Sequence, residues 1–373
     1  MQRLTFSRIL IFALLFFALQ YASFRTQGAG NPNPSGKYYD EIQQSRAVLA
    51  DLLDEYPAIS VAVSIGDDVI WEEAFGLADV DNSIPATPDH QFRYYSLSKS
   101  IAGLAAAKMV QDGQLDLDAP VHYYLPDLPE HYCDVKVHQL ISHTAGVRHY
   151  QKKEWTRISQ YHCDSVAQAL PVFVDDPLEF EPGTDYTYTS FGYVLLCHVL
   201  ERASGVAYDA YIQEHFFDLL GLKTIGLDQS ETAQQNPAKF YHKWNGKRAR
   251  EAKPVNNSCK FGGGGYVGTA SELMQLHQAL VTGRLLNPDM TKRYYQAFLK
   301  RDSTSAHYAF GIGVNKAEDG TMFNAHTGSA LGGYNVLIVV PEQKLVIVML
   351  ANRFSDEMID AAQEILDMFL AQA

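Results

Sequence analysis

The chain has 373 residues, of which 47% are hydrophobic and 20% are charged, and its formal net charge at pH 7 is -13. This composition is typical of a globular protein with enough length for a large buried core. The acidic balance argues against a nucleic-acid partner, because binding phosphates requires clustered lysine and arginine.

The first part of the chain is typical of an export signal. Arg3 and Arg8 form a positively charged start, and Ile9 to Leu19 is an unbroken apolar run. We therefore expect residues 1–24 to be a signal peptide or, if uncleaved, a membrane anchor. A Gly-, Asn- and Pro-rich stretch then predicts a flexible tether over residues 25–37. The expected location is periplasmic or secreted, with a membrane tether if the segment is kept.

Strand-like runs lie at both ends of the remaining chain, and helix-like runs fill its middle. The expected strands are Ile59–Ile65, Val69–Phe75, Tyr308–Val314, Val336–Pro341 and Leu345–Leu350. The expected terminal helices are Tyr38–Glu55 and one that begins at Ser355 as its N-cap. We expect an α/β (α+β) fold over residues 38–373, in which an antiparallel sheet is flanked by the N- and C-terminal helices. We expect a mostly helical lobe, at about residues 96–230, to be inserted into this α/β part. The active site is expected in the cleft between the sheet and the helical lobe.

Within this middle region, Ser96-Leu97-Ser98-Lys99 carries the strongest chemical signal. Positions i and i+3 lie on one face of a helix, so Lys99 can sit over Ser96 one turn later. A serine hydroxyl becomes a nucleophile when a neighbouring base takes its proton, and a desolvated lysine can act as that base. The spacing predicts a serine nucleophile with its general base.

Four cysteines, Cys133, Cys163, Cys197 and Cys259, follow this motif with spacing that matches no zinc or C-x-x-C pattern. Cys197 lies inside an apolar helical run, so we expect a buried free thiol. Cys133 and Cys163 flank one loop region and could form a disulfide in an oxidising compartment, although spacing does not establish the pairing.

A second motif is Tyr188-Thr189-Ser190, which precedes an apolar helical run, Val194–Leu200. A phenol near the Lys99 ammonium is expected to shift toward its ionised form and to serve as a proton shuttle. Ser190 adds a short hydrogen-bonding side chain.

The third motif is His326-Thr327-Gly328-Ser329, which we expect ahead of a strand. A glycine there allows the strand backbone to approach the substrate. The backbone N–H groups of Ser329 and Ser96 could hold a developing oxyanion. His326 could donate a hydrogen bond to the substrate or to the hydroxyl relay, and we expect it to be fractionally charged near neutral pH.

Together these three motifs resemble those of the serine β-lactamase and penicillin-binding-protein superfamily, specifically its class C-like branch. The resemblance covers about residues 40–370 and includes Leu140–Gly146 and Glu201–Gly205. It implies a β-lactamase/transpeptidase-like fold without a metal or cofactor. The residues that it implies are Ser96, Lys99 and Tyr188 for catalysis, and Ser190, His326, Thr327, Gly328 and Ser329 for substrate and oxyanion binding.

Two departures from the antibiotic-hydrolysing pattern favour a peptidase, amidase or esterase. Ser190 stands where the resembled β-lactamases have asparagine, and His326 stands where they have lysine. The expected function is a serine hydrolase that acts through an acyl-enzyme on a small-molecule or peptide substrate. The alternatives are a true β-lactamase or D-alanyl-D-alanine carboxypeptidase, or a penicillin-sensing or filament-forming scaffold without turnover. A homo-oligomer is also open.

Two further patterns suggest sites that we reject. Gly263–Gly268 matches the dinucleotide-binding spacing, but no strand-like run precedes it, so we expect only a loop that passes close to the cleft. His138, His143 and His149 lack metal-binding spacing. We expect His143 to hold its loop by hydrogen bonds.

Overall fold

The computed structural model describes residues 29–32, 36–151, 154–159, 161–228, 235–246 and 248–372. The predicted signal peptide or anchor, residues 1–24, lies outside the described residues. Four residues of the predicted flexible tether, Ala29–Pro32, form strand β1, which pairs with β3 (Asp68–Asp79). In the described ranges, we find no helix with the length and apolar character needed to cross a membrane.

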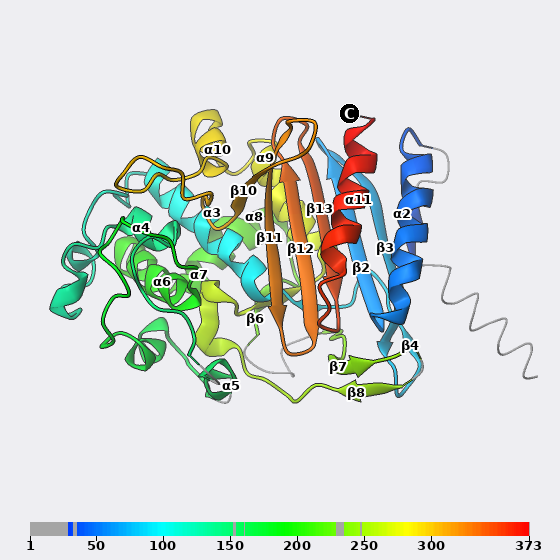
Figure 1. The fold of residues 1–373 in the computed structure, drawn as a ribbon, viewed down its shortest axis with the longest axis horizontal. Helices are drawn as coiled ribbons and strands as arrows, with labels where there is room; N and C mark the ends of the chain where they lie inside the picture. Colours follow the sequence, from blue (N-terminus) through cyan, green and yellow to red (C-terminus); the bar gives the residue numbers. More distant parts are fainter. Residues whose placement is uncertain are drawn as a thin grey trace, which may run out of the picture.

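One antiparallel sheet forms the centre of the molecule (Figure 1). Its strand order is β1-β3-β2-β13-β12-β11-β10, with β4 paired to β3. The N-terminal hairpin therefore joins the C-terminal strands, with Val61 opposite Met349. The sheet strands are β2 Ala58–Ile65, β4 Ile84–Pro85, β10 Gly313–Lys316, β11 Met322–Ala330, β12 Gly333–Val340 and β13 Leu345–Ala351. Short strands elsewhere are β5 Phe92–Arg93, β6 Gly226–Leu227, β7 Tyr241–Trp244, β8 Ala249–Glu251 and β9 Tyr266–Gly268.

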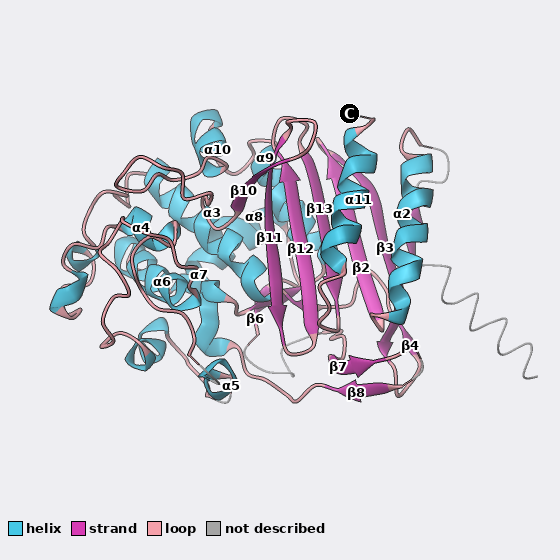
Figure 2. Ribbon diagram, viewed as in Figure 1, coloured by secondary structure: helices cyan, strands magenta, loops and turns pink. Residues whose placement is uncertain are grey.

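Helices cover both faces of this sheet, and most of the remaining helices lie beside the sheet (Figures 1 and 2). Helices α2 and α11 pack together on one face, and α9 covers the opposite face. The helices are α2 Tyr39–Asp51, α3 Ser98–Gln111, α4 Val137–Ile141, α5 Glu154–Ile158, α6 Ser190–Ser204, α7 Tyr208–Ile212, α8 Asp218–Leu220, α9 Ala270–Val281, α10 Pro288–Tyr294 and α11 Met358–Leu370. This arrangement confirms the predicted fold class.

The central strands are apolar throughout because both of their faces are buried. Along β13, Val346 and Val348 point into the core shared with α3 and α9, whereas Ile347 and Met349 point into the core under α2 and α11. Successive side chains of a strand point to opposite faces, so a strand covered on both sides reads as a continuous apolar run.

Two predicted boundaries were wrong. Ser355 is not the N-cap of α11, which begins at Met358 with Glu357 in the cap position. The Tyr56 hydroxyl donates to the Ser355 carbonyl and accepts from the Met358 amide, so a distant tyrosine caps the helix. The strand predicted at Tyr308–Val314 is limited to Gly313–Lys316. A tight turn at Gly311 (φ +81°) packs on α3 just before this strand.

The disulfide also differs from the suggested pairing. Cys163 bonds to Cys259, 96 residues away, and Cys133 is an exposed free thiol. Cys259 lies in the 3-10 helix η8 (Ser258–Gly263), and the Cys163 amide donates to the Ser258 hydroxyl at 2.9 Å. The Cys133–Cys163 pairing was therefore wrong, whereas the buried free thiol predicted at Cys197 is confirmed.

Candidate active site

The Ser96 hydroxyl and the Lys99 amine lie together at the start of α3. Ser96 is in a 3-10 turn, η2 (Tyr95–Leu97), that continues directly into the helix. Lys99 Nζ lies 3.2 Å from Ser96 Oγ, as the three-residue spacing predicts. The Lys99 side chain is fully buried. The local chain geometry alone therefore brings a candidate nucleophile and a candidate base together.

The environment of Lys99 favours its neutral form. Burial pushes the pKa of Lys99 well below its usual 10.5, and the nearby charge of Lys260 lowers it further. The amine donates to the Gly263 carbonyl oxygen at 2.6 Å and lies 3.2 Å from Ser190 Oγ. A neutral amine held by these partners can accept the proton of Ser96.

Tyr188 and Ser190 come from the N-terminus of α6. Thr189 is the N-cap, since its hydroxyl accepts a hydrogen bond from the Gly192 amide at 3.2 Å. Lys99 Nζ lies 4.8 Å from the centre of the Tyr188 ring. Burial nevertheless raises the pKa of Tyr188 well above 10, and its hydrogen bond with Ser96 offsets this only in part. The expectation of a phenol shifted toward its ionised form was therefore wrong, because desolvation dominates and Lys99 is itself shifted toward its neutral form.

Two histidines hold this segment in place. The Thr189 amide donates to His143 Nδ1 and the Ser190 amide donates to His149 Nδ1, each at 3.1 Å. Each imidazole accepts at Nδ1, so its proton is on Nε2. The predicted loop-holding hydrogen bond of His143 is confirmed. Burial, with a smaller contribution from Lys99, lowers the pKa of His149 to about 4, so its ring is neutral at pH 7.

The third motif lies ahead of strand β12, as expected, but it is itself part of strand β11, which was not predicted. Thr327 and Ser329 are exposed on the strand, whereas Gly328 is buried. A Cβ at Gly328 would lie 2.2 Å from the Tyr94 carbonyl oxygen and 3.2 Å from the Leu97 amide nitrogen. The glycine therefore lets the strand approach the turn that carries Ser96, which differs from the expected approach to substrate.

His326 is neutral, and both of its ring nitrogens have protein partners. Nδ1 lies 2.6 Å from the Thr327 carbonyl oxygen, which can only accept, so Nδ1 carries the proton. The Tyr308 hydroxyl then donates to Nε2 at 2.7 Å. Burial, with a smaller contribution from the charge of Lys99, lowers the pKa of His326 to about 3. The expected fractional charge near neutral pH was therefore wrong.

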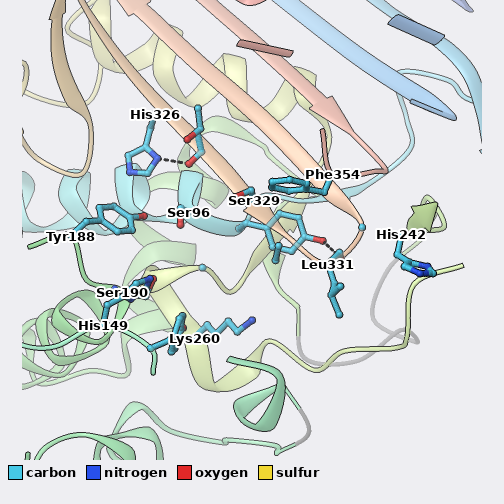
Figure 3. Close-up of a pocket in the computed structure, with 17 residues that line it drawn as sticks. Ser96, His149, Tyr188, Ser190, His242, Lys260, His326, Ser329, Leu331 and Phe354 are labelled. Carbon is cyan, nitrogen blue, oxygen red and sulfur yellow. Dashed lines mark hydrogen bonds between the residues drawn. The ribbon is translucent and has the colours of Figure 1, made fainter. Parts of the chain in front are cut away.

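A cavity of about 810 Å³ opens above these groups (Figure 3). The predicted residues that line it are Ser96, Tyr188, Ser190, His326, Thr327 and Ser329. Lys99 and Gly328 do not line it. Gly263 and Gly264 border the cavity, which confirms that the glycine-rich loop passes close to the cleft. Side chains that sequence reasoning did not assign to the cavity are Tyr95, His149, Tyr150, His242, Lys260, Leu331 and Phe354.

Tyr95, directly before Ser96, adopts a strained backbone conformation. Its φ is +49°, in the left-handed region that side chains other than glycine rarely adopt. Its hydroxyl donates to the Leu331 carbonyl oxygen at 3.0 Å. Backbone strain of this kind concentrates at functional sites, where the surrounding structure enforces it. No sequence pattern for a positive φ would have singled out this tyrosine.

The described ranges contain no group of three or more histidine, cysteine or acidic side chains that could hold a metal ion. His143 and His149 instead hold the backbone of Thr189 and Ser190.

Comparison with known proteins places the chain among related sequences. The family profile described as Beta-lactamase matches residues 46–371. The human mitochondrial serine beta-lactamase-like protein LACTB is 29% identical over 396 residues, which span 81% of this chain and 72% of that protein.

Two solved structures share the fold. The octameric penicillin-binding protein homologue from Pyrococcus abyssi has a TM-score of 0.75 at 22% identity, over 88% of this chain and 77% of that chain. The D-amino acid amidase from Ochrobactrum anthropi SV3, complexed with L-phenylalanine amide, has a TM-score of 0.74 at 21% identity, over 89% of this chain and 99% of that chain.

Proposed function

The chain belongs to the beta-lactamase family, and from this we propose that it is a serine hydrolase that cleaves an amide or ester through an acyl-enzyme on Ser96. One observation carries the proposal. The Ser96 hydroxyl lies 3.2 Å from a fully buried lysine amine whose pKa is well below its usual value. Such an amine is neutral often enough to remove the serine proton.

In the proposed mechanism, Ser96 Oγ attacks the substrate carbonyl carbon while its proton passes to Lys99. The backbone N–H groups of Ser96 and Ser329 stabilise the oxyanion, and both residues line the cavity. Tyr188, hydrogen-bonded to Ser96, relays the proton to the leaving group. Water then attacks the acyl-enzyme and releases the acid and free Ser96.

Two features favour a peptidase, amidase or esterase over an efficient β-lactamase. Ser190 lacks the amide donor of an asparagine, and the neutral His326 supplies no positive charge to an antibiotic carboxylate. Relatives named as an amidase and as a penicillin-binding protein homologue support acyl transfer as the reaction class.

The test is intact-mass spectrometry after incubation with a fluorophosphonate probe. We expect one adduct on the wild type, none on Ser96→Ala, and one on the control Ser204→Ala, which removes a hydroxyl at the far end of α6. No adduct on folded wild type would overturn the proposal and favour the scaffold alternative. If the probe labels Ser96 but esters and nitrocefin acylate the protein only once and are not turned over, the result would favour a penicillin sensor.

Self-association and export are separate proposals. The Pyrococcus abyssi homologue is octameric, which motivates the first proposal, and light scattering over a dilution series tests it. For the second, we propose that residues 1–24 direct export and that residues 38–373 form the hydrolase domain. Determining the N-terminal residue of the exported protein tests whether the segment is cleaved.

A further inference from the structure

Lys260 places an ammonium group in the cavity without a hydrogen-bond or ion-pair partner among the described residues. It belongs to η8, lines the cavity beside Gly263 and Gly264, and has 6% of its surface exposed. Across the described part of the chain, its amine makes no hydrogen bond or ion pair. Figure 3 shows it on the side of the cavity that carries Ser190, while Ser329 lies on the strand side.

The surroundings of Lys260 compensate its charge only in part. Asp228 favours the charged form of Lys260, but that carboxylate accepts from Arg93 at 2.8 Å and from Asn257 at 2.7 Å. The described residues that line the cavity include no aspartate or glutamate. A buried charge that lacks a direct partner is costly unless a ligand pairs with it.

Lys260 also keeps its positive charge in this site. Burial lowers its pKa only to about 8, with Asp228 opposing the shift, so the amine is mostly protonated at pH 7. Lys99, His149 and His326 are all shifted toward their neutral forms. An anion entering the cavity would therefore meet the positive charge of Lys260, on the wall away from β11.

We propose that Lys260 binds a carboxylate on the acyl part of the substrate, so that the preferred substrates are amides or esters of acyl groups that carry a second carboxylate. The inference rests on the proposed hydrolase function. The leaving group takes its proton from Tyr188, and Figure 3 shows Tyr188 and Lys260 at different corners of the cavity. The acyl chain is therefore the part of the substrate that extends toward Lys260.

Turnover of two matched esters tests this assignment. The 4-nitrophenyl monoester of glutaric acid carries the second carboxylate, and 4-nitrophenyl methyl glutarate carries an uncharged ester in its place. We expect the wild type to have a kcat/KM at least 10-fold higher for the acid, and Lys260→Met to lose roughly 10- to 100-fold of that ratio, the range expected for a charged hydrogen bond. Lys260→Arg should keep most of the preference.

The matched control is Lys243→Met, which removes the same charge from an exposed position on β7 and should leave the ratio unchanged. Thermal unfolding of each variant shows whether it is folded. A ratio near one in the wild type, or a ratio unchanged in folded Lys260→Met, would overturn the assignment.

A binding measurement separates this inference from the proposed function. In the Ser96→Ala chain, calorimetry compares N-phenylglutaramic acid with its methyl ester, neither of which is turned over. If the acid binds more tightly than the methyl ester and Lys260→Met removes this difference, the carboxylate site is supported. This holds even if the wild type hydrolyses neither ester, because the absence of turnover would reject only the hydrolase function. Equal binding of both compounds would reject the carboxylate site, whatever the turnover.

Discussion

The backbone of Gly328 packs directly on the carbonyl oxygen of Tyr94: a Cβ added to the glycine would lie 2.2 Å from that oxygen. Carbon and oxygen that are not bonded cannot approach so closely, so any side chain at Gly328 must push β11 away from η2. This contact fixes the distance between the strand that carries Ser329 and the turn that carries Ser96.

Gly328→Ala is therefore expected to damage both stability and activity. Forcing a methyl group into a filled space costs about 1–3 kcal/mol in free energy of unfolding. Moving Ser329 away from Ser96 should also slow fluorophosphonate labelling by more than 10-fold. Chemical denaturation and labelling kinetics measure the two effects. Gly226→Ala, where no atom lies within 4 Å of the added Cβ, is the control, and wild-type labelling in Gly328→Ala would contradict the prediction.

Lys99→Arg is expected to lower acylation by at least 10²-fold, since general-base catalysis contributes about that much or more. An arginine is permanently protonated and cannot give up its proton, so it cannot serve as the base. In the proposed mechanism the base is the neutral amine, and acylation should therefore rise with pH through a pKa well below 10.5. Stopped-flow acylation from pH 5 to 10 measures this rise of the rate with pH. If the same rise persists in folded Lys99→Arg, a residue other than Lys99 is the base.

Tyr188→Phe distinguishes a proton relay from the primary base. Because burial keeps the Tyr188 phenol protonated, loss of its hydroxyl should slow the reaction. It should not move the low-pH limb of the rate profile, which Lys99 sets. The slowing should be greater for an anilide than for a 4-nitrophenyl ester, because only the amine leaving group requires a proton. A shift of the limb in Tyr188→Phe would show that the tyrosine itself titrates as the base.

The buried histidines predict a loss of stability in mild acid. The pKa values of His277 and His326 are lowered from 6.5 to about 3, and that of His149 to about 4, chiefly by burial. Below pH 6.5 the unfolded chain binds protons that the folded chain does not. The free energy of unfolding therefore falls as pH drops from 6.5 toward 4, by up to about 1.4 kcal/mol per pH unit for each histidine.

Urea denaturation at pH 7 and pH 5 measures this slope. Acidic groups with lowered pKa values, such as Asp79 and Glu154, lose their stabilising effect only at lower pH, because their ordinary values are 3.8 and 4.5. His277→Gln should reduce the slope between pH 6.5 and 5, since it removes one titrating group outside the cavity. An unchanged slope in that variant would show that His277 does not resist protonation.

Reducing the Cys163–Cys259 disulfide is expected to lower the free energy of unfolding by about 2–4 kcal/mol. Cys259 immediately precedes Lys260 and lies four residues before Gly263, whose carbonyl holds the Lys99 amine. Reduction should therefore also slow Ser96 labelling. Cys163→Ala and the exposed-thiol control Cys133→Ser, each assayed with and without reductant, test this. Equal stability of oxidised and reduced wild type would contradict it.

Local patterns predicted the parts of the fold that depend on neighbouring residues. The Ser96–Lys99 pair follows from helix periodicity, and the apolar run of Leu345–Ala351 follows from burial on both faces. Strand β11 was missed because it borders the cavity. Its buried positions include Asn324, His326 and Gly328, so no apolar alternation marks it.

Contacts between distant residues account for the other differences. Tyr56 caps α11 from 302 residues away, so no local signal at Ser355 could reveal the boundary. Cys259 reaches Cys163 only because η8 packs on the loop that carries Cys163. Burial itself sets the pKa values of Tyr188 and His326, and burial follows from the complete packing rather than from the motif.

Ser96 and Lys99 lie on one continuous helical segment, whereas Tyr188 and Ser190 belong to α6 and the residues just before it. A small rigid displacement of α6 relative to α3 would change the distances from Ser96 to Tyr188 but leave the Ser96–Lys99 distance unaltered. Substitutions in the packing between these two helices should therefore impair the departure of the leaving group before they impair nucleophile activation. Variants with altered packing between α3 and α6 are therefore expected to be acylated at normal rates by activated esters and to fail with amides.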